Sequence, residues 1–91
     1  MALTEPQIEA AIDALLARRA PGATICPSDA ARALDPEDWR AHMDAVRAVA
    51  FALADRGRLE VTQRGEVVDG RTARGPIRLR RVSAGPGPGS R

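Results

Sequence analysis

Residues 27–36 read Pro-Ser-Asp-Ala-Ala-Arg-Ala-Leu-Asp-Pro, and this stretch decides the fold that the sequence predicts. Ser28 belongs to the residue types that cap helix N-termini, and the alanine-rich segment up to Leu34 is typical of a two-turn helix. Asp35 then caps another helix, with Pro36 at the first helical position, where its missing N–H is not needed. Two helices joined by so few residues indicate a helix-turn-helix.

The residues before this stretch predict one more helix. Thr4 and Gln7 have the spacing of a capping box, and apolar residues recur at helical spacing from Ile8 to Leu16. Pro21-Gly22 ends this helix. Thr24-Ile25 is then expected to be extended, because it approaches a proline at position 27 that disfavours helical backbone before it.

The residues after it predict one long helix followed by a hairpin. The helix that starts at Pro36 meets no breaker before Gly57, which gives it about 20 residues or roughly 30 Å. The apolar period then changes to two, first over residues 59–64 and again over residues 76–82. This pattern predicts a two-stranded hairpin with a long tip at residues 65–75.

The order of these elements predicts an α+β winged helix, with a three-helix helix-turn-helix core and a C-terminal β-hairpin wing. Residues 1–82 are expected to form this single domain, with Thr24-Ile25 as a short third strand, and residues 83–91 to be a disordered Gly/Pro/Ser-rich tail. The hydrophobic fraction is 44%, but 18 of these residues are alanine. A core this thin leaves little room for the pocket of a metabolic enzyme, so no catalytic activity is predicted.

Four segments of the sequence resemble a known family. They are Pro-Ser-Asp-Ala-Ala-Arg-Ala-Leu at 27–34, Trp-Arg-Ala-His-Met at 39–43, Val46-Arg47, and Arg-Gly-Pro-Ile-Arg-Leu-Arg at 74–80. Together they are similar to a small bacterial winged-helix-like domain family of unknown function, over roughly residues 5–82. The resemblance supports the fold and implies no activity, substrate or site.

The charge is unevenly divided along the chain. All 14 basic residues are arginine, and the net charge is only +2. Residues 1–57 carry a charge of −3, whereas residues 58–91 carry eight arginines against three acids, or +5. The arginine side chain is suited to phosphate because its donors form a rigid fork. The sequence therefore predicts weak binding of double-stranded DNA, in a regulatory role, through an arginine-rich wing.

The predicted contacts to nucleic acid are arginines of the third helix and of the wing, namely Arg40, Arg47, Arg64, Arg71, Arg74, Arg78 and Arg80. The acids at positions 35, 37 and 38 argue against base reading by the start of the third helix, because they would face phosphates. The opposing hypothesis is that the basic hairpin is paired with the chain's own acids or is simply solvated.

An alternative function is a protein-interaction or dimerisation module without a role at nucleic acid. One face of the third helix carries small residues, Ala41, Ala45, Ala48 and Ala52. These would pack against the first helix of the same chain or form the seam of a homodimer. Phe51 projects away from the predicted core, so it is either covered by the hairpin or exposed as an anchor for another protein.

The remaining candidate residues predict no chemistry. Trp39 is expected to be the main core residue of the third helix, Cys26 to be buried and inert, and His42 to lie near Asp38 without a nucleophile beside it. We expect no metal, no cofactor and no small-molecule substrate. Since no apolar run suits a membrane span and no secretory signal is visible, a reduced cytoplasmic protein is expected.

Overall fold

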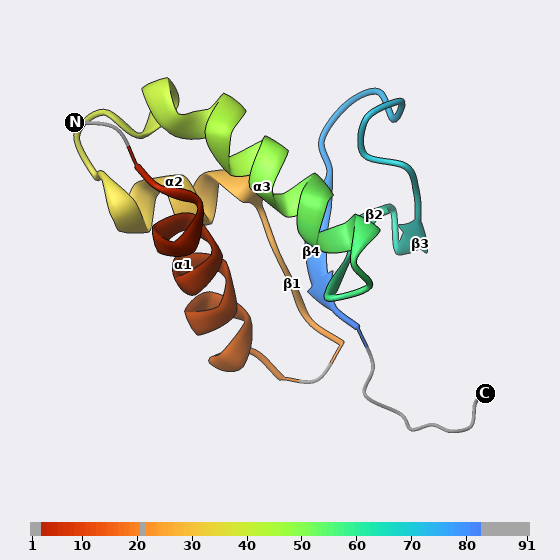
Figure 1. Cartoon of the computed structure of the whole chain (residues 1–91). Helices are drawn as coiled ribbons and strands as arrows, with labels where there is room; N and C mark the ends of the chain where they lie inside the picture. Colours follow the sequence, from red (N-terminus) through yellow and green to blue (C-terminus); the bar gives the residue numbers. More distant parts are fainter. Residues whose placement is uncertain (1–2, 21, 83–91) are drawn as a thin grey trace.

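The computed structural model describes residues 3–20 and 22–82, and the predicted tail at 83–91 lies outside them. Within these residues the α+β class is confirmed: three α-helices and a short 3-10 helix pack beside a four-stranded sheet (Figure 1). The elements are α1 (Glu5–Ala17), β1 (Thr24–Ile25), α2 (Pro27–Leu34), η1 (Trp39–His42), α3 (Met43–Asp55), β2 (Leu59–Gln63), β3 (Glu66–Val67) and β4 (Arg78–Arg81). None of the described helices is long and apolar enough to span a membrane.

The sheet is antiparallel, with the strand order β1-β4-β2-β3. β1 pairs with β4, which confirms the short third strand, and β4 pairs with β2 from Leu59↔Arg81 to Thr62↔Arg78. The arrangement of helices and sheet is compatible with a winged helix. The expected hairpin between β2 and β4 is present, but its tip differs from the prediction.

Part of the predicted tip folds back as a further strand. β3 pairs with the last two residues of β2, so the two strands are joined only by Arg64 and Gly65. Both of these residues have positive φ angles, 55° and 85°, as a type I′ hairpin turn requires. The sequence did not suggest this turn, because the favoured residue at the first position is asparagine rather than arginine.

The helix starts are only partly as predicted. The capping box of α1 is confirmed, since the Thr4 amide donates to Gln7 Oε1 at 2.8 Å and the Gln7 amide donates to Thr4 Oγ1 at 3.3 Å. The prediction that Ser28 caps α2 is wrong, because Cys26 occupies the N-cap position and Pro27 is the first helical residue. Asp29 instead accepts a hydrogen bond from the Cys26 amide at 2.9 Å.

The prediction of one long third helix from Pro36 is wrong for its first part. Asp35 ends α2, its amide bonded to the carbonyl of Ala31 at 2.9 Å, and α3 starts only at Met43. The Asp35 carboxylate accepts from the Asp38 amide at 3.1 Å and lies 2.9 Å from His42 Nε2. Aspartate side chains that bond the backbone just ahead favour turns over continuing helix, which explains the break.

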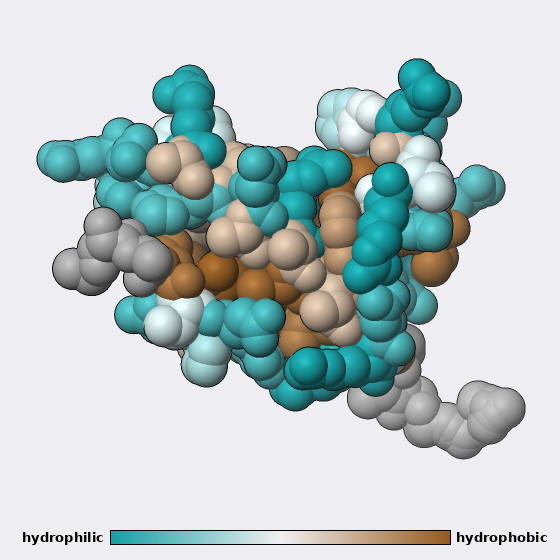
Figure 2. Space-filling view, turned by 45° about the horizontal axis from the view of Figure 1, so that its top comes forward, coloured by the Kyte–Doolittle hydropathy of each residue, from teal (hydrophilic) through white to brown (hydrophobic). Residues whose placement is uncertain are grey.

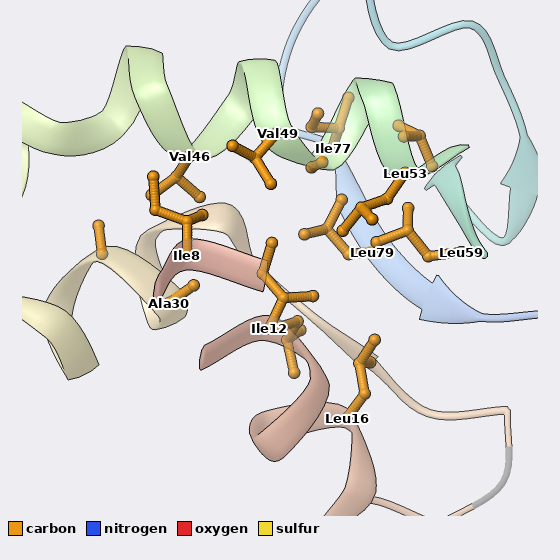
Figure 3. Packing of buried hydrophobic residues seen from close by; sticks show 14 residues of the cluster. Ile8, Ile12, Leu16, Ala30, Val46, Val49, Leu53, Leu59, Ile77 and Leu79 are labelled. Carbon is orange, nitrogen blue, oxygen red and sulfur yellow. The ribbon is translucent and has the colours of Figure 1, made fainter. Parts of the chain in front are cut away.

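The core lies between the three helices and the inner face of the sheet. Figure 3 shows Val46 and Val49 pointing from α3 toward Ile8 of α1. Trp39 is only half-buried at the edge of this core, so the prediction that it is the main core residue is wrong. The buried hydrophobic residues are Ile8, Ile12, Leu16, Ile25, Ala30, Ala31, Val46, Val49, Ala50, Leu53, Leu59, Val61, Ile77 and Leu79.

The Asp35 turn predicts a specific response to acid. The hydrogen bond with His42, and then that with the Asp38 amide, lowers the pKa of Asp35. A carboxylate with a depressed pKa stabilises the fold above its unfolded pKa of about 4, and this contribution is lost as the pH falls through the folded-state pKa. We expect Asp35→Asn to lose less stability than the wild type on acidification to about pH 3.

The measurement is the urea midpoint at several pH values for wild type, Asp35→Asn and the control Glu66→Gln. Glu66 is exposed on β3, and the described part of the chain gives it no ion pair. The control should follow the wild type. An acid response in Asp35→Asn equal to that of the wild type would contradict the role assigned to this carboxylate.

Candidate nucleic-acid interface

Two of the predicted nucleic-acid contacts, Arg78 and Arg80, are held on the outer face of the sheet. Leu79 between them points into the core, so alternation along β4 turns both arginines outward. Arg80 donates twice to Glu60 Oε1, at 3.0 and 2.7 Å, across the β2–β4 pair. Arg78 donates to Thr24 Oγ1 at 2.8 Å and to Cys26 Sγ at 2.7 Å. Both guanidinium groups therefore tie strands together.

Arg71 is also engaged within the chain. Its guanidinium donates to both carboxylate oxygens of Asp55, at 3.1 and 2.8 Å, and so fastens the loop after β3 to the end of α3. This hydrogen bond lowers the pKa of Asp55 and raises that of Arg71. The pair is more than half exposed, which limits its contribution to stability. Arg58 is paired in the same way with Glu9 of α1, at 2.9 Å.

Of the two predictions for Phe51, the structure agrees with the one in which the wing covers the ring, and the ring is not fully exposed. The ring is half-buried, and Gly70 lies directly on it, leaving no space for a Cβ atom. The guanidinium carbons of Arg47 and Arg71 lie 5.6 and 5.5 Å from the ring centroid. Phe51 thus contacts one arginine of its own helix α3 and one of the loop after β3.

Trp39 gathers two arginines as well. The guanidinium carbons of Arg32, from α2, and Arg40, from η1, lie 4.3 and 4.4 Å from its ring centroid. Trp39 therefore links an arginine of α2 with one of η1. Sequence reasoning missed Arg32, because the turn between α2 and η1 sets its distance to Trp39 and no spacing rule reveals it.

The aromatic contacts leave these guanidinium groups able to bind anions. A guanidinium that stacks on a ring uses its flat face, and its N–H groups still point outward along the edge. Trp39 and Phe51 are the only aromatic residues among Phe, Trp and Tyr in the chain, and each is contacted by two arginines. The stacking holds Arg32, Arg40 and Arg47 in place with donors available for phosphate.

Arg64 and Arg74 lie on two segments of the wing that Gln63 joins. Arg64 occupies the β2–β3 turn, and the neighbouring Gln63 side chain donates to the carbonyls of Arg74 and Pro76. Both arginine side chains are exposed, and neither makes an ion pair with any residue that the structure describes. They add two available cations to those around the aromatic rings.

The alanine face does not pack against α1 as one prediction proposed. Ala41, Ala45 and Ala48 are exposed and Ala52 is half-buried. The buried arc of α3 is the one that contains Val46 and Val49, and the alanines lie beyond its edge. Figure 2 shows a band of apolar surface bordered by hydrophilic side chains on the face that includes the top of Figure 1. The homodimer seam stays a prediction.

The family comparison matches almost the whole described region. The model of a family described as "Protein of unknown function (DUF3253)" matches residues 5–82. The chain belongs to the DUF3253 family. The match runs from the start of α1 to the residue after β4, so it includes all the arginines described above. No curated protein matches the sequence.

Two other residues of this DUF3253 domain lie differently from their predictions. His42 contacts Asp35 rather than the predicted Asp38, and Cys26 is half-buried rather than fully enclosed. Residues 3–20 and 22–82 bring together no three His, Cys, Asp or Glu side chains that could hold a metal ion. What the arrangement offers chemically is a set of anion-binding donors.

The contact between Gly70 and Phe51 yields a prediction on stability. A methyl group at position 70 would overlap the ring, so Gly70→Ala must displace either the loop or Phe51. We expect this DUF3253 domain to lose about 1–3 kcal/mol, the usual cost of overpacking. Urea unfolding followed by circular dichroism measures the change.

The double variant Gly70→Ala/Phe51→Leu provides the control. Leucine lacks the ring atoms that the added methyl group would strike, so the alanine should cost less in this background than in the wild type. If Gly70→Ala is as stable as the wild type, the loop does not rest on Phe51 as described.

Proposed function

We propose that the chain binds double-stranded DNA weakly and without base reading, through phosphate contacts from α2, η1, α3 and the wing tip. The observation that carries this proposal is that each of the two aromatic rings contacts two arginines, three of which, Arg32, Arg40 and Arg47, form no ion pair with a residue that the structure describes. The proposed contacts are Arg32, Arg40, Arg47, Arg64 and Arg74.

Two considerations favour a duplex over a single strand. Proteins that bind single strands stack successive bases on open aromatic faces. Here Arg32 and Arg40 lie over the Trp39 ring, and Gly70 lies against Phe51. Both rings already have partners within the chain, whereas contacts to phosphate need only the guanidinium edges.

Phosphate contacts fit the surface better than base reading does. Glu37 and Asp38 are exposed in the turn before η1, where the start of a recognition helix would approach the groove. Asp35 is already occupied by His42 and the Asp38 amide. In this proposal Arg78 and Arg80 support the sheet and Arg71 holds the loop, so the wing contributes chiefly through its tip.

The proposal predicts a defined salt dependence. Each phosphate contact contributes about −0.9 to the slope of log K against log salt, so three to five contacts give a slope of roughly −2.7 to −4.5. A dissociation constant of about 10⁻⁴–10⁻⁶ M is expected near physiological salt, as for other non-specific binders. Fluorescence anisotropy of a labelled duplex of random sequence at several salt concentrations measures both quantities.

A charge-matched pair of variants locates the contacts. Arg40→Gln/Arg47→Gln should bring the slope about two units closer to zero, because two phosphate contacts are lost. Arg18→Gln/Arg19→Gln removes the same charge at the far end of α1, away from α3 in Figure 1, and should leave the slope unchanged. Absence of binding at low salt, or equal effects of the two variants, would refute the proposal.

A variant at Arg64 distinguishes a role of this residue in binding from a role in stability. Its left-handed φ of 55° is unfavourable for arginine by roughly 1 kcal/mol but is well tolerated by asparagine. We expect Arg64→Asn to unfold at a higher urea concentration and yet to bind the duplex about threefold more weakly, since a phosphate contact is lost. A variant that is more stable and binds equally well would remove Arg64 from the interface.

A further inference from the structure

A groove of about 420 Å³ lies beside the wing, between the end of α3, the first half of β2 and the loop after β3. Its lining includes the apolar side chains of Phe51, Ala54, Leu59, Val61 and Val68. Val67, at 58% exposure the large hydrophobic residue most exposed in the described chain, also lines it. The groove therefore offers apolar surface that the described fold does not cover.

The groove follows an edge of the sheet that has no neighbouring strand. β3 pairs only with Thr62 and Gln63, and one further hydrogen bond joins the Val68 amide to the Val61 carbonyl at 2.9 Å. Beside Leu59 and Glu60, no strand of the described chain lies on this side of β2. Unpaired backbone groups at such an edge can hydrogen-bond an added strand.

The charge around the groove is acidic although the chain as a whole is basic. Its ionisable lining residues are Asp55, Glu60, Asp69 and Arg71, and Glu60 is also paired with Arg80, so three carboxylates face two cations. Arg71 is already bound to Asp55, and its amide donates to Asp69 Oδ1 at 3.0 Å. A basic occupant would therefore meet the better electrostatic complement.

The opposite edge of β2, which pairs with β4, shows which pattern of side chains a neighbouring strand of β2 can have. There β4 places Leu79 opposite Val61, on the core side, and Arg80 opposite Glu60, where the two side chains are 2.7 Å apart. A strand that alternates apolar and basic residues thus satisfies both faces of β2. The open edge presents the same two faces over the same residues.

We propose that this groove binds an extended segment of a protein partner, alternating apolar and basic residues, as an added antiparallel or parallel strand along the first half of β2. The apolar side chains would fill the space beside Phe51 and Val61, and the basic side chains would face Glu60 and Asp69. This interaction does not depend on the binding of nucleic acid.

The test uses the full chain, labelled with ¹⁵N, and a capped heptapeptide that alternates arginine and valine. Titration should shift the amide signals of Leu59, Val61, Val68 and Gly70 most, and hydrogen exchange at Leu59 should slow. A matched heptapeptide with glutamate in place of arginine should bind about tenfold more weakly, as expected for two lost surface ion pairs within their usual range of strength.

A variant of Val67, which lines the groove, provides a second test. Val67→Lys changes an exposed side chain, so the fold should be retained, and it places a cation at the groove. It should weaken the arginine peptide severalfold and strengthen the glutamate peptide. No binding of the arginine peptide at millimolar concentration, equal affinity for the two peptides, or shifts that map to another surface would each overturn the proposal.

Discussion

The carboxylate of Asp35 holds the arrangement on which the rest of the structure depends. By accepting from the Asp38 amide and contacting His42, it ends α2 and keeps residues 39–42 in a 3-10 helix. This break sets the phase in which α3 begins. Val46 and Val49 consequently face the core, whereas Ala41, Ala45 and Ala48 face outward. Trp39 lies at the edge of the core beside Arg32 and Arg40.

Tertiary contacts, rather than net charge, decide which arginines are paired within the chain. The excess of +5 over residues 58–91 suggested one basic surface, yet Arg58, Arg71 and Arg80 each meet a carboxylate, and Arg78 meets Thr24 and Cys26. Each of these contacts joins two elements that are far apart in the sequence. The available donors are instead those of the wing tip and of the aromatic rings, which lie on both sides of the charge boundary.

Local patterns predicted what depends on local physics. The alternation at Leu59, Val61, Ile77 and Leu79 indicated β2 and β4, because a strand with one buried face repeats every two residues. The same reasoning missed β3, which has two residues and exists only through the left-handed turn at Arg64. It left the pairing of the hairpin arginines with the chain's own acids as an alternative, which the Arg80–Glu60 contact now shows for Arg80. It missed the stacking of Arg32 on Trp39, since this is a consequence of tertiary contacts.

The two proposed surfaces meet at Phe51, and the Arg71–Asp55 ion pair beside it belongs to the groove. Arg71 and Asp55 bind each other at the groove, beside the ring that also holds Arg47. Because Arg71 holds the loop after β3 through Asp55 and Asp69, a phosphate bound at Arg47 would leave Asp55 paired and the charge of the groove unchanged. Binding of nucleic acid and binding of a basic segment are therefore expected to be independent, since each surface uses its own charged groups.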